Sequence, residues 1–159
     1  MIKRSIQGED ITIINIYAPN LASQYVRQML ISMKREINSN TITVGDFNTP
    51  LTPMNRSTKQ NISTEARPLN DTMEQLDLIN IYRTFYPKTI NFTFFSSAHG
   101  TFSKIHYILS HKCSLDKFKK IEIIPSIFSD HNAIRLDVNY RGKNYLKLQH
   151  MEAKQHAPE

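Results

Sequence analysis

Two short polar motifs, each next to an expected strand, carry acidic, amide and imidazole side chains that could do chemistry. Gly45-Asp46-Phe47-Asn48 follows a β-branched run, and Ser129-Asp130-His131-Asn132 precedes the last expected strand. A carboxylate can act as a base, and amide or imidazole groups can stabilise developing charge. Each motif taken alone is more typical of a polar turn. Together with Tyr17 on an α/β background, they predict strand ends that converge on one cleft.

A strand, a helix and a second strand are expected before the first motif. Ile11–Tyr17 is β-branched and nearly alternating, and apolar residues recur at helical spacing from Gln24 to Asn38, with Ser23 as a cap. Thr41–Val44 is then a strand, which indicates a crossover connection within one sheet. The acid and the amide should project from the carboxyl end of this second strand, where open α/β sheets place ligands.

The rest of the chain predicts a long loop, a second helix and several strands. The expected elements are a loop over Thr49–Arg67, a helix carrying Leu69, Met73, Leu76 and Ile79, and strands at Phe92–Phe95, Ile105–Leu109, Ile121–Ile124 and Ile134–Tyr140. The small polar run Ser96–Ser103 fits a hairpin loop. Residues 141–159 are polar and irregular, and we expect a loose tail there.

Length and composition favour one basic globular domain. The 159 residues carry a net charge of +6 and a pI near 9.5, which favours polyanionic partners. The single cysteine, Cys113, and the lack of paired Cys/His spacing typical of zinc sites indicate a reducing compartment. No apolar run is long enough for a membrane span, and no signal-peptide pattern follows Met1. We therefore expect an intracellular protein of the nucleus or cytoplasm, not a secreted or membrane protein.

Six motifs in order resemble the endonuclease domain of LINE-type (non-LTR) retrotransposon polyproteins, which belongs to the exonuclease/endonuclease/phosphatase family. They are Asn15–Asn20, Gly45–Asn48, Asp77–Arg83, Phe92–Ser96, Ser103–Ile105 and Ser129–His131. The match covers residues 1–140. It implies a partial domain with a two-sheet α/β sandwich that lacks its N-terminal strands, followed by the irregular tail over 141–159.

The resemblance implies metal-dependent nicking of DNA phosphodiester bonds, with Mg²⁺ or Mn²⁺ as the cofactor and DNA as the partner. Asp46 would act on the attacking water, Asn48 would donate to the phosphoryl oxygens, and His131 would stabilise charge on the phosphate. Asp130 would belong to the metal side of the site. The expected substrate contacts are Tyr17, Asn20 and Ser103, and residues 97–103 resemble a hairpin that enters the DNA minor groove.

Two departures from the family pattern bear on activity. His106 stands where the family has an aspartate that orients the catalytic histidine, so a loss of roughly 100- to 10,000-fold is expected by analogy with His-orienting aspartates elsewhere. If His106 and His131 approach each other, a shared proton would stabilise the pair at low pH, a hypothesis that NMR titration tests. The family's N-terminal asparagine and its metal-binding glutamate have no counterpart before Met1, which leaves Asp130 as an incomplete metal site. Missing strands would also leave a sheet edge open to self-association.

The sequence therefore leaves open whether the chain is an enzyme. The first interpretation is a LINE-type endonuclease fragment with impaired hydrolysis. The alternative is a catalytically inactive remnant that still binds nucleic acid through its positive charge. A third interpretation, a hydrolase of phosphomonoesters or lipids from the same superfamily, is disfavoured by the match over Asp77–Arg83.

Overall fold

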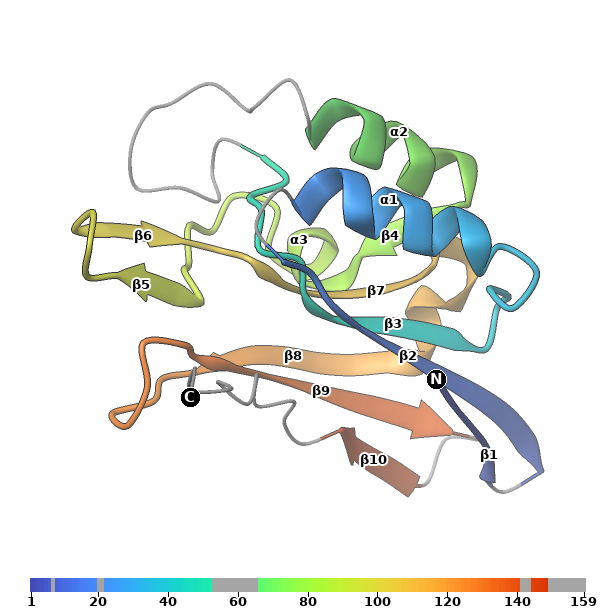
Figure 1. The fold of residues 1–159 in the computed structure, drawn as a ribbon. Helices are drawn as coiled ribbons and strands as arrows, with labels where there is room; N and C mark the ends of the chain where they lie inside the picture. The colour runs from blue at the N-terminus through green and yellow to red at the C-terminus, as the bar shows by residue number, and fades with distance from the viewer. Residues whose placement is uncertain (7, 20–21, 53–65, 141–143, 149–159) are drawn as a thin grey trace.

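A computed structural model of the chain describes residues 1–6, 8–19, 22–52, 66–140 and 144–148 (Figure 1). The expected substrate residue Asn20 lies outside the described residues, as does most of the loop expected over Thr49–Arg67. Among the residues described, no helix combines the length and the apolar character needed to cross a bilayer.

Five strands form the larger sheet, in the order β1-β2-β3-β7-β4. Their bounds are β1 Ile2–Ile6, β2 Glu9–Tyr17, β3 Thr41–Asp46, β4 Leu78–Asn80 and β7 His106–His111. β2 and β3 pair in parallel, with helix α1 (Ala22–Ser32) between them in the chain. The strand-helix-strand order predicted from the sequence is thus confirmed. The antiparallel partner of β3 is β7, which brings residues 106–110 against 42–46.

Helices α1 and α2 (Ala66–Gln75) lie together on one side of this sheet, as Figure 1 shows. Val26 and Leu30 are spaced one helical turn apart on α1, and both are fully buried. They pack in one apolar cluster with Ile14 of β2 and Leu69 of α2. This cluster packs the two helices on one face of the larger sheet, and this packing holds β3 and its end in place.

The smaller sheet has the order β10-β9-β8 and lies against the opposite face of the larger one (Figure 1). It contains β8 Phe118–Ile124, β9 Ala133–Tyr140 and β10 Asn144–Leu148, and a 3-10 helix at Lys112–Lys117 leads into it. Ile134, Leu136 and Val138 of β9 are buried at alternate positions, as the sequence predicted. They join Ile42 and Ile108 of the larger sheet in a second apolar cluster. Burial of that shared cluster holds the two sheets together.

A hairpin forms from β5 (Phe94–Ser96) and β6 (Thr101–Ser103), but its second strand lies inside the loop predicted over Ser96–Ser103. The strand expected at Ile105–Leu109 pairs with β3 and β4 instead, so the predicted pairing of this hairpin was wrong. The backbone of Thr93 closes the base of the hairpin, since the Thr93 N–H donates to the Ser103 carbonyl, and links it to the loop before β9, since the Thr93 carbonyl accepts from the Asn132 N–H. A short helix, α3 (Ile81–Phe85), is capped by the Asn80 side chain, which accepts from the Arg83 N–H.

Several elements differ from the sequence prediction. α1 begins at Ala22, so Ser23 lies inside its first turn and is not the cap. The α-helix ends at Ser32 rather than Asn38, because the turns that follow use bonds to the third residue back, from the Lys34 N–H to the Ile31 carbonyl and from the Glu36 N–H to the Met33 carbonyl. The second helix stops at Gln75, before Ile79 joins β4.

Both ends of the described chain contain strands that the sequence analysis did not predict. β1 is mostly exposed, so it lacks the apolar alternation that reveals a half-buried strand. β10 lies within the segment expected to be an irregular tail, and it pairs with β9 from Asn144 to Leu148. Backbone pairing with an edge strand needs no particular side chains, which is why polar composition was a poor guide there. Residues 149–159 lie outside the described chain.

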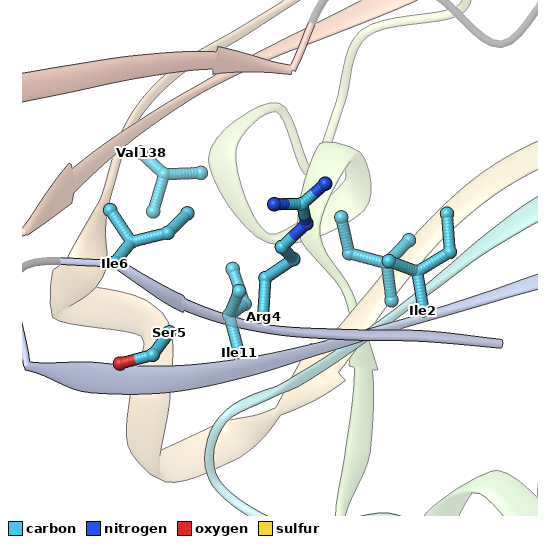
Figure 2. A pocket seen from close by; sticks show the side chains of 7 residues that line it. Ile2, Arg4, Ser5, Ile6, Ile11 and Val138 are labelled. Carbon is cyan, nitrogen blue, oxygen red and sulfur yellow. The ribbon is translucent and has the colours of Figure 1, made fainter.

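An apolar groove opens between β1, β2 and β9 (Figure 2). Ile2, Ile6, Ile11 and Val138 line it, and the Arg4 side chain lies among them in Figure 2. The groove is far from the two polar motifs, which lie at the other end of the strands.

Candidate active site

The end of β3 is built on a backbone contact that requires glycine. Gly45 has φ +149°, and a Cβ atom there would lie 1.8 Å from the Ile16 carbonyl oxygen. No side chain fits such a contact, so β2 can approach β3 closely only because residue 45 is glycine. The next residue, Asp46, pairs with Tyr17, and its carbonyl accepts from the Ala18 N–H at 2.9 Å. The acid is therefore held by two adjacent strands.

The Asp46 side chain is buried and bonded to the turn that follows it. Its Oδ1 accepts the Asn48 N–H at 2.8 Å, and Asn48 adopts φ 49° to complete this Asx turn. Burial raises the pKa of Asp46, against the Asn48 N–H bond and the nearby His131, which lower it. A carboxylate with a raised pKa is a stronger base than an exposed one.

His106 begins β7 directly opposite Asp46 in the antiparallel pair. Its Nε2 lies 3.6 Å from Asp46 Oδ2, and its Nδ1 lies 2.8 Å from the Thr93 hydroxyl. Burial, with a smaller repulsion from His131, lowers the pKa of His106 to about 3. The ring is consequently neutral near pH 7, and its contact with Asp46 is not an ion pair.

His131 reaches the same point from the loop before β9. Its Nδ1 lies 2.9 Å from His106 Nε2 and 3.9 Å from Asp46 Oδ2. Its ring packs on Phe94 with centroids 4.8 Å apart, and an isolated bridge joins the two backbones. The two imidazole nitrogens thus lie within hydrogen-bond distance, and the sharing of a proton between them at low pH stays a prediction.

Four other residues predicted for the site lie on elements other than those that carry Asp46, His106 and His131, or in the adjoining loops. Asp130 Oδ1 lies 3.7 Å from His131 Nε2 and its side chain is partly exposed. Tyr17 is 66% exposed at the end of β2, beside Asp46 in the sheet. Asn48 is exposed on the turn, and Ser103 ends β6 at the base of the hairpin. The structure thus brings Asp46, His106 and His131 into contact, and of the other predicted residues it places Asp130, Tyr17, Asn48 and Ser103 on separate strand ends and loops.

Two features were missed by sequence reasoning. Thr93 is fully buried, and its hydroxyl contacts His106 Nδ1 while accepting the Ile105 and His106 N–H groups. It lies within a matched motif, yet a threonine in a strand carries no signal of a role. Ile127 and Phe128 are 90% and 94% exposed in the loop that precedes the second polar motif. An apolar pair with such exposure indicates a contact surface, but nothing in the sequence alone shows that it is exposed.

Comparisons with known proteins identify the fold. No protein-family model matches the sequence. The chain is 27% identical over 137 residues to the Transposon TX1 uncharacterized 149 kDa protein of Xenopus laevis, a match that covers 81% of this chain and 10% of that protein.

Three solved structures superpose well on the chain, each with a TM-score of 0.68 and 87% of this chain covered. An AP endonuclease from Archaeoglobus fulgidus is 17% identical, with 64% of its length covered. The endonuclease domain of TRAS1, a telomere-specific non-LTR retrotransposon, is 15% identical, with 62% covered. The 3′ phosphatase NExo from Neisseria, bound to a product DNA hairpin, is 15% identical, with 64% covered.

The chain has the fold of the exonuclease/endonuclease/phosphatase class. Within that class, its resemblance to the endonuclease domains of LINE-type retrotransposons, predicted from the sequence motifs, is confirmed by the transposon relative and by the TRAS1 structure. The chain spans less than two thirds of the length of each of these four proteins.

The residues at the centre of the site do not fit the magnesium ion that the resemblance implies. Magnesium takes oxygen ligands in an octahedral arrangement. Among the described residues, the group close enough to hold a metal is Asp46, His106 and His131, which supplies two imidazole nitrogens and one carboxylate. Asp130 does not belong to this group. No step of the chemistry below therefore depends on magnesium.

Proposed function

We propose that this chain is a LINE-type endonuclease domain, a two-sheet α/β sandwich that acts on DNA phosphodiester bonds with hydrolysis weakened by His106. The observation that carries the proposal is the meeting of Asp46 and His131, from separate parts of the chain, at 3.9 Å. Two groups at that separation can act on one phosphate and its attacking water.

The proposed roles are those that the resemblance implies, and the geometry of the three elements supports them. Asp46, with a pKa raised by burial, accepts a proton from water or orients it. The Asn48 amide, on the turn after β3, donates to a phosphoryl oxygen, and His131 stabilises the charge that develops there. Tyr17, at the end of β2 beside Asp46, contacts the phosphate. Fixed strand ends supply these groups with little motion during the reaction.

DNA is proposed to lie across the hairpin and the loop before β9. The hairpin carries Phe95 and Phe102, whose rings are 4.7 Å apart and partly exposed. Ile127 and Phe128 are exposed close to His131 in the chain. Apolar side chains of this kind wedge against bases, while the net charge of +6 attracts the phosphate backbone.

A second candidate, DNA binding without hydrolysis, is favoured by one observation. His106 is neutral and contacts His131 where the family pattern has an anion. A neutral imidazole cannot stabilise a positive charge on His131 during the reaction. Binding through the hairpin and the net charge would survive this loss.

A nicking assay on supercoiled plasmid tests the proposal. We expect slow conversion to the open circular form, abolished by Asp46→Ala and unchanged by Ile31→Ser at an exposed position on α1, away from the hairpin. A gel shift measured in parallel should weaken steeply with salt. A salt-sensitive shift without cleavage by the unaltered chain would establish the second candidate, and the lack of both would refute the two together.

A further inference from the structure

Asp46, His106 and His131 form a group that could hold a metal ion, a role that the proposed hydrolysis does not require. Three potential metal ligands from separate elements face one another: Oδ2 of Asp46, Nε2 of His106 and Nδ1 of His131. Asp46 is the last residue of β3, His106 is the first residue of β7, and His131 lies in the loop before β9. All three side chains are largely buried, so few water molecules compete for these atoms.

The distances within the group match the edges of a tetrahedral zinc site. Zinc bonds of roughly 2.0–2.1 Å to nitrogen and oxygen place neighbouring ligand atoms about 3.3 Å apart. The separations here are 2.9 Å between the two imidazole nitrogens, 3.6 Å from His106 to Asp46, and 3.9 Å from His131 to Asp46. Shifts of a few tenths of an ångström would equalise them around a bound ion.

Neighbouring side chains hold the two rings from behind, as hydrogen-bond partners hold the ligand histidines of metal proteins. Metal-bound histidines donate their other N–H to an oxygen, which fixes the ring and its tautomer. The second nitrogen of His106 lies 2.8 Å from the Thr93 hydroxyl, which holds the ring in place. The second nitrogen of His131 lies 3.7 Å from the Asp130 carboxylate. Asp46 in turn is fixed by the Asn48 N–H.

We propose that Asp46, His106 and His131 form a binding site for a zinc-type transition-metal ion. Imidazole nitrogens with one carboxylate suit Zn²⁺ or Co²⁺ and disfavour Mg²⁺. Three protein ligands leave a fourth position for water or for an oxygen of a phosphate. Histidine at position 106 is what creates the site, since an aspartate there would leave a single imidazole. Because the proposal concerns metal binding alone, it stands whether or not the chain cleaves DNA.

The test is titration of the full chain, stripped of metal, with zinc chloride and with cobalt chloride. We expect one saturable high-affinity site, visible absorption typical of four-coordinate cobalt, and no displacement by excess magnesium. Thr93→Val removes a hydrogen-bond partner of a ligand and should weaken zinc binding by roughly 10- to 100-fold. His106→Asp and His131→Asn each remove a ligand and should weaken zinc binding by more than that. Far-UV circular dichroism checks that each variant folds.

Two controls separate this site from other ligands in the chain. His111 Nδ1 lies 2.9 Å from Cys113 Sγ and could hold metal weakly, so Cys113→Ser should leave the affinity unchanged and the cobalt spectrum should lack thiolate charge-transfer bands. His99→Asn, in the exposed hairpin loop, should also have no effect. The proposal is overturned if the unaltered chain shows no saturable zinc binding, or if binding survives His106→Asp and disappears with Cys113→Ser.

Discussion

At the scale of single residues, residue 106 decides whether His131 has an anion or a neutral ring beside it. Asp46 and His131 meet there, yet the ring beside them is buried and neutral near pH 7, since burial lowers the pKa of His106 to about 3. An aspartate at this position would accept the Nδ1 proton of His131 and stabilise its charged form. The histidine leaves His131 without that anion.

Replacing His106 by aspartate should therefore raise nicking and abolish the proposed zinc binding in the same variant. We expect a gain of roughly 100- to 10,000-fold in cleavage rate of supercoiled plasmid, measured with magnesium present. Adding Asp46→Ala to the same chain should remove the gain. A variant that folds and binds DNA but cleaves no faster than the unaltered chain would contradict the role assigned to His106.

Lys104 is a second residue whose chemistry is unusual. Its side chain is buried, its Nζ lies 3.3 Å from the centroid of the Tyr82 ring, and no hydrogen-bond partner for Nζ is present among the described residues. Burial, with added repulsion from Arg83, lowers the pKa of Lys104 to about 7. The folded chain thus binds fewer protons than the unfolded chain between about pH 7 and the ordinary lysine pKa of 10.5.

Stability should accordingly rise as the pH increases from about 7 toward 10.5, because the unfolded state binds the extra proton across this interval. Lys104→Met should remove this slope and stabilise the fold near pH 7 by roughly 1–4 kcal/mol, since it replaces a buried unpaired charge with an apolar chain of similar length. Urea unfolding with EDTA, near pH 7 and near pH 10, measures both effects. The exposed Lys88→Met should leave the slope intact; a slope that persists in Lys104→Met would show that another group causes it.

At the scale of elements, the site depends on how closely two strands approach. β2 and β3 pair in parallel up to Tyr17 and Asp46, and Gly45 allows the Ile16 carbonyl to lie where a Cβ atom would be. The backbone position of Asp46 is therefore set by contacts between the two strands, and its carboxylate is oriented by the Asn48 N–H of the turn that follows.

Gly45→Ala should destabilise the fold by at least about 3 kcal/mol, because the added Cβ would clash with backbone that cannot move away. Gly100→Ala provides a matched control. Gly100 also has a positive φ, +61°, but a Cβ there meets nothing within 4 Å, so a loss of about 1 kcal/mol is expected. Urea unfolding of both variants gives the comparison, and equal losses would rule out the close approach as the cause.

The loop before β9 makes its own prediction. Phe128 is 94% exposed, so Phe128→Ser should leave unfolding unchanged while weakening DNA binding by roughly 10-fold if the ring stacks on or wedges against a base. Fluorescence anisotropy with a short duplex measures the affinity. Ile31→Ser, at a 47% exposed position on α1, should not alter it. Equal affinity of both variants would place the DNA elsewhere.

Sequence patterns revealed the elements with regular burial and missed those without it. β9 alternates buried and partly exposed residues, and α1 repeats Val26 and Leu30 one turn apart, so both could be recognised. β1 is exposed along most of its length, and a pattern of burial could not show it.

The site was predictable in part for a similar reason. The motif residues Asp46 and His131 could be identified, but the contact of Thr93 with His106 arises only when β5 and β7 are brought together. The spacing of Cys and His residues likewise gave no sign of the metal-binding group, because positions 46, 106 and 131 are far apart in the chain.

At the scale of the whole molecule, two sheets share one apolar cluster, and the larger sheet ends at β1 on one side. An edge strand offers unpaired backbone groups to another chain. Beside it, Ile2 is 60% exposed at the apolar groove of Figure 2.

We therefore expect self-association through the β1 edge at high protein concentration. Light scattering coupled to gel filtration should show a mass that rises with concentration, and Ile2→Lys should return the chain to a monomer, since a charge at the edge opposes pairing. Ile31→Lys on α1 serves as the control and should not change the mass. A monomer at all concentrations would show that this edge is not adhesive.

Thr93 links the hairpin to the loop that carries His131 and to the ring of His106. Its N–H is anchored to the far strand of the hairpin, its carbonyl to the loop that carries His131, and its hydroxyl to the imidazole of His106. If a bound duplex bends the hairpin, we expect Thr93 to shift and the orientation of both imidazole rings to change with it. Strain applied at the hairpin tip would then alter the alignment of His106 and His131 without direct contact between them and the DNA.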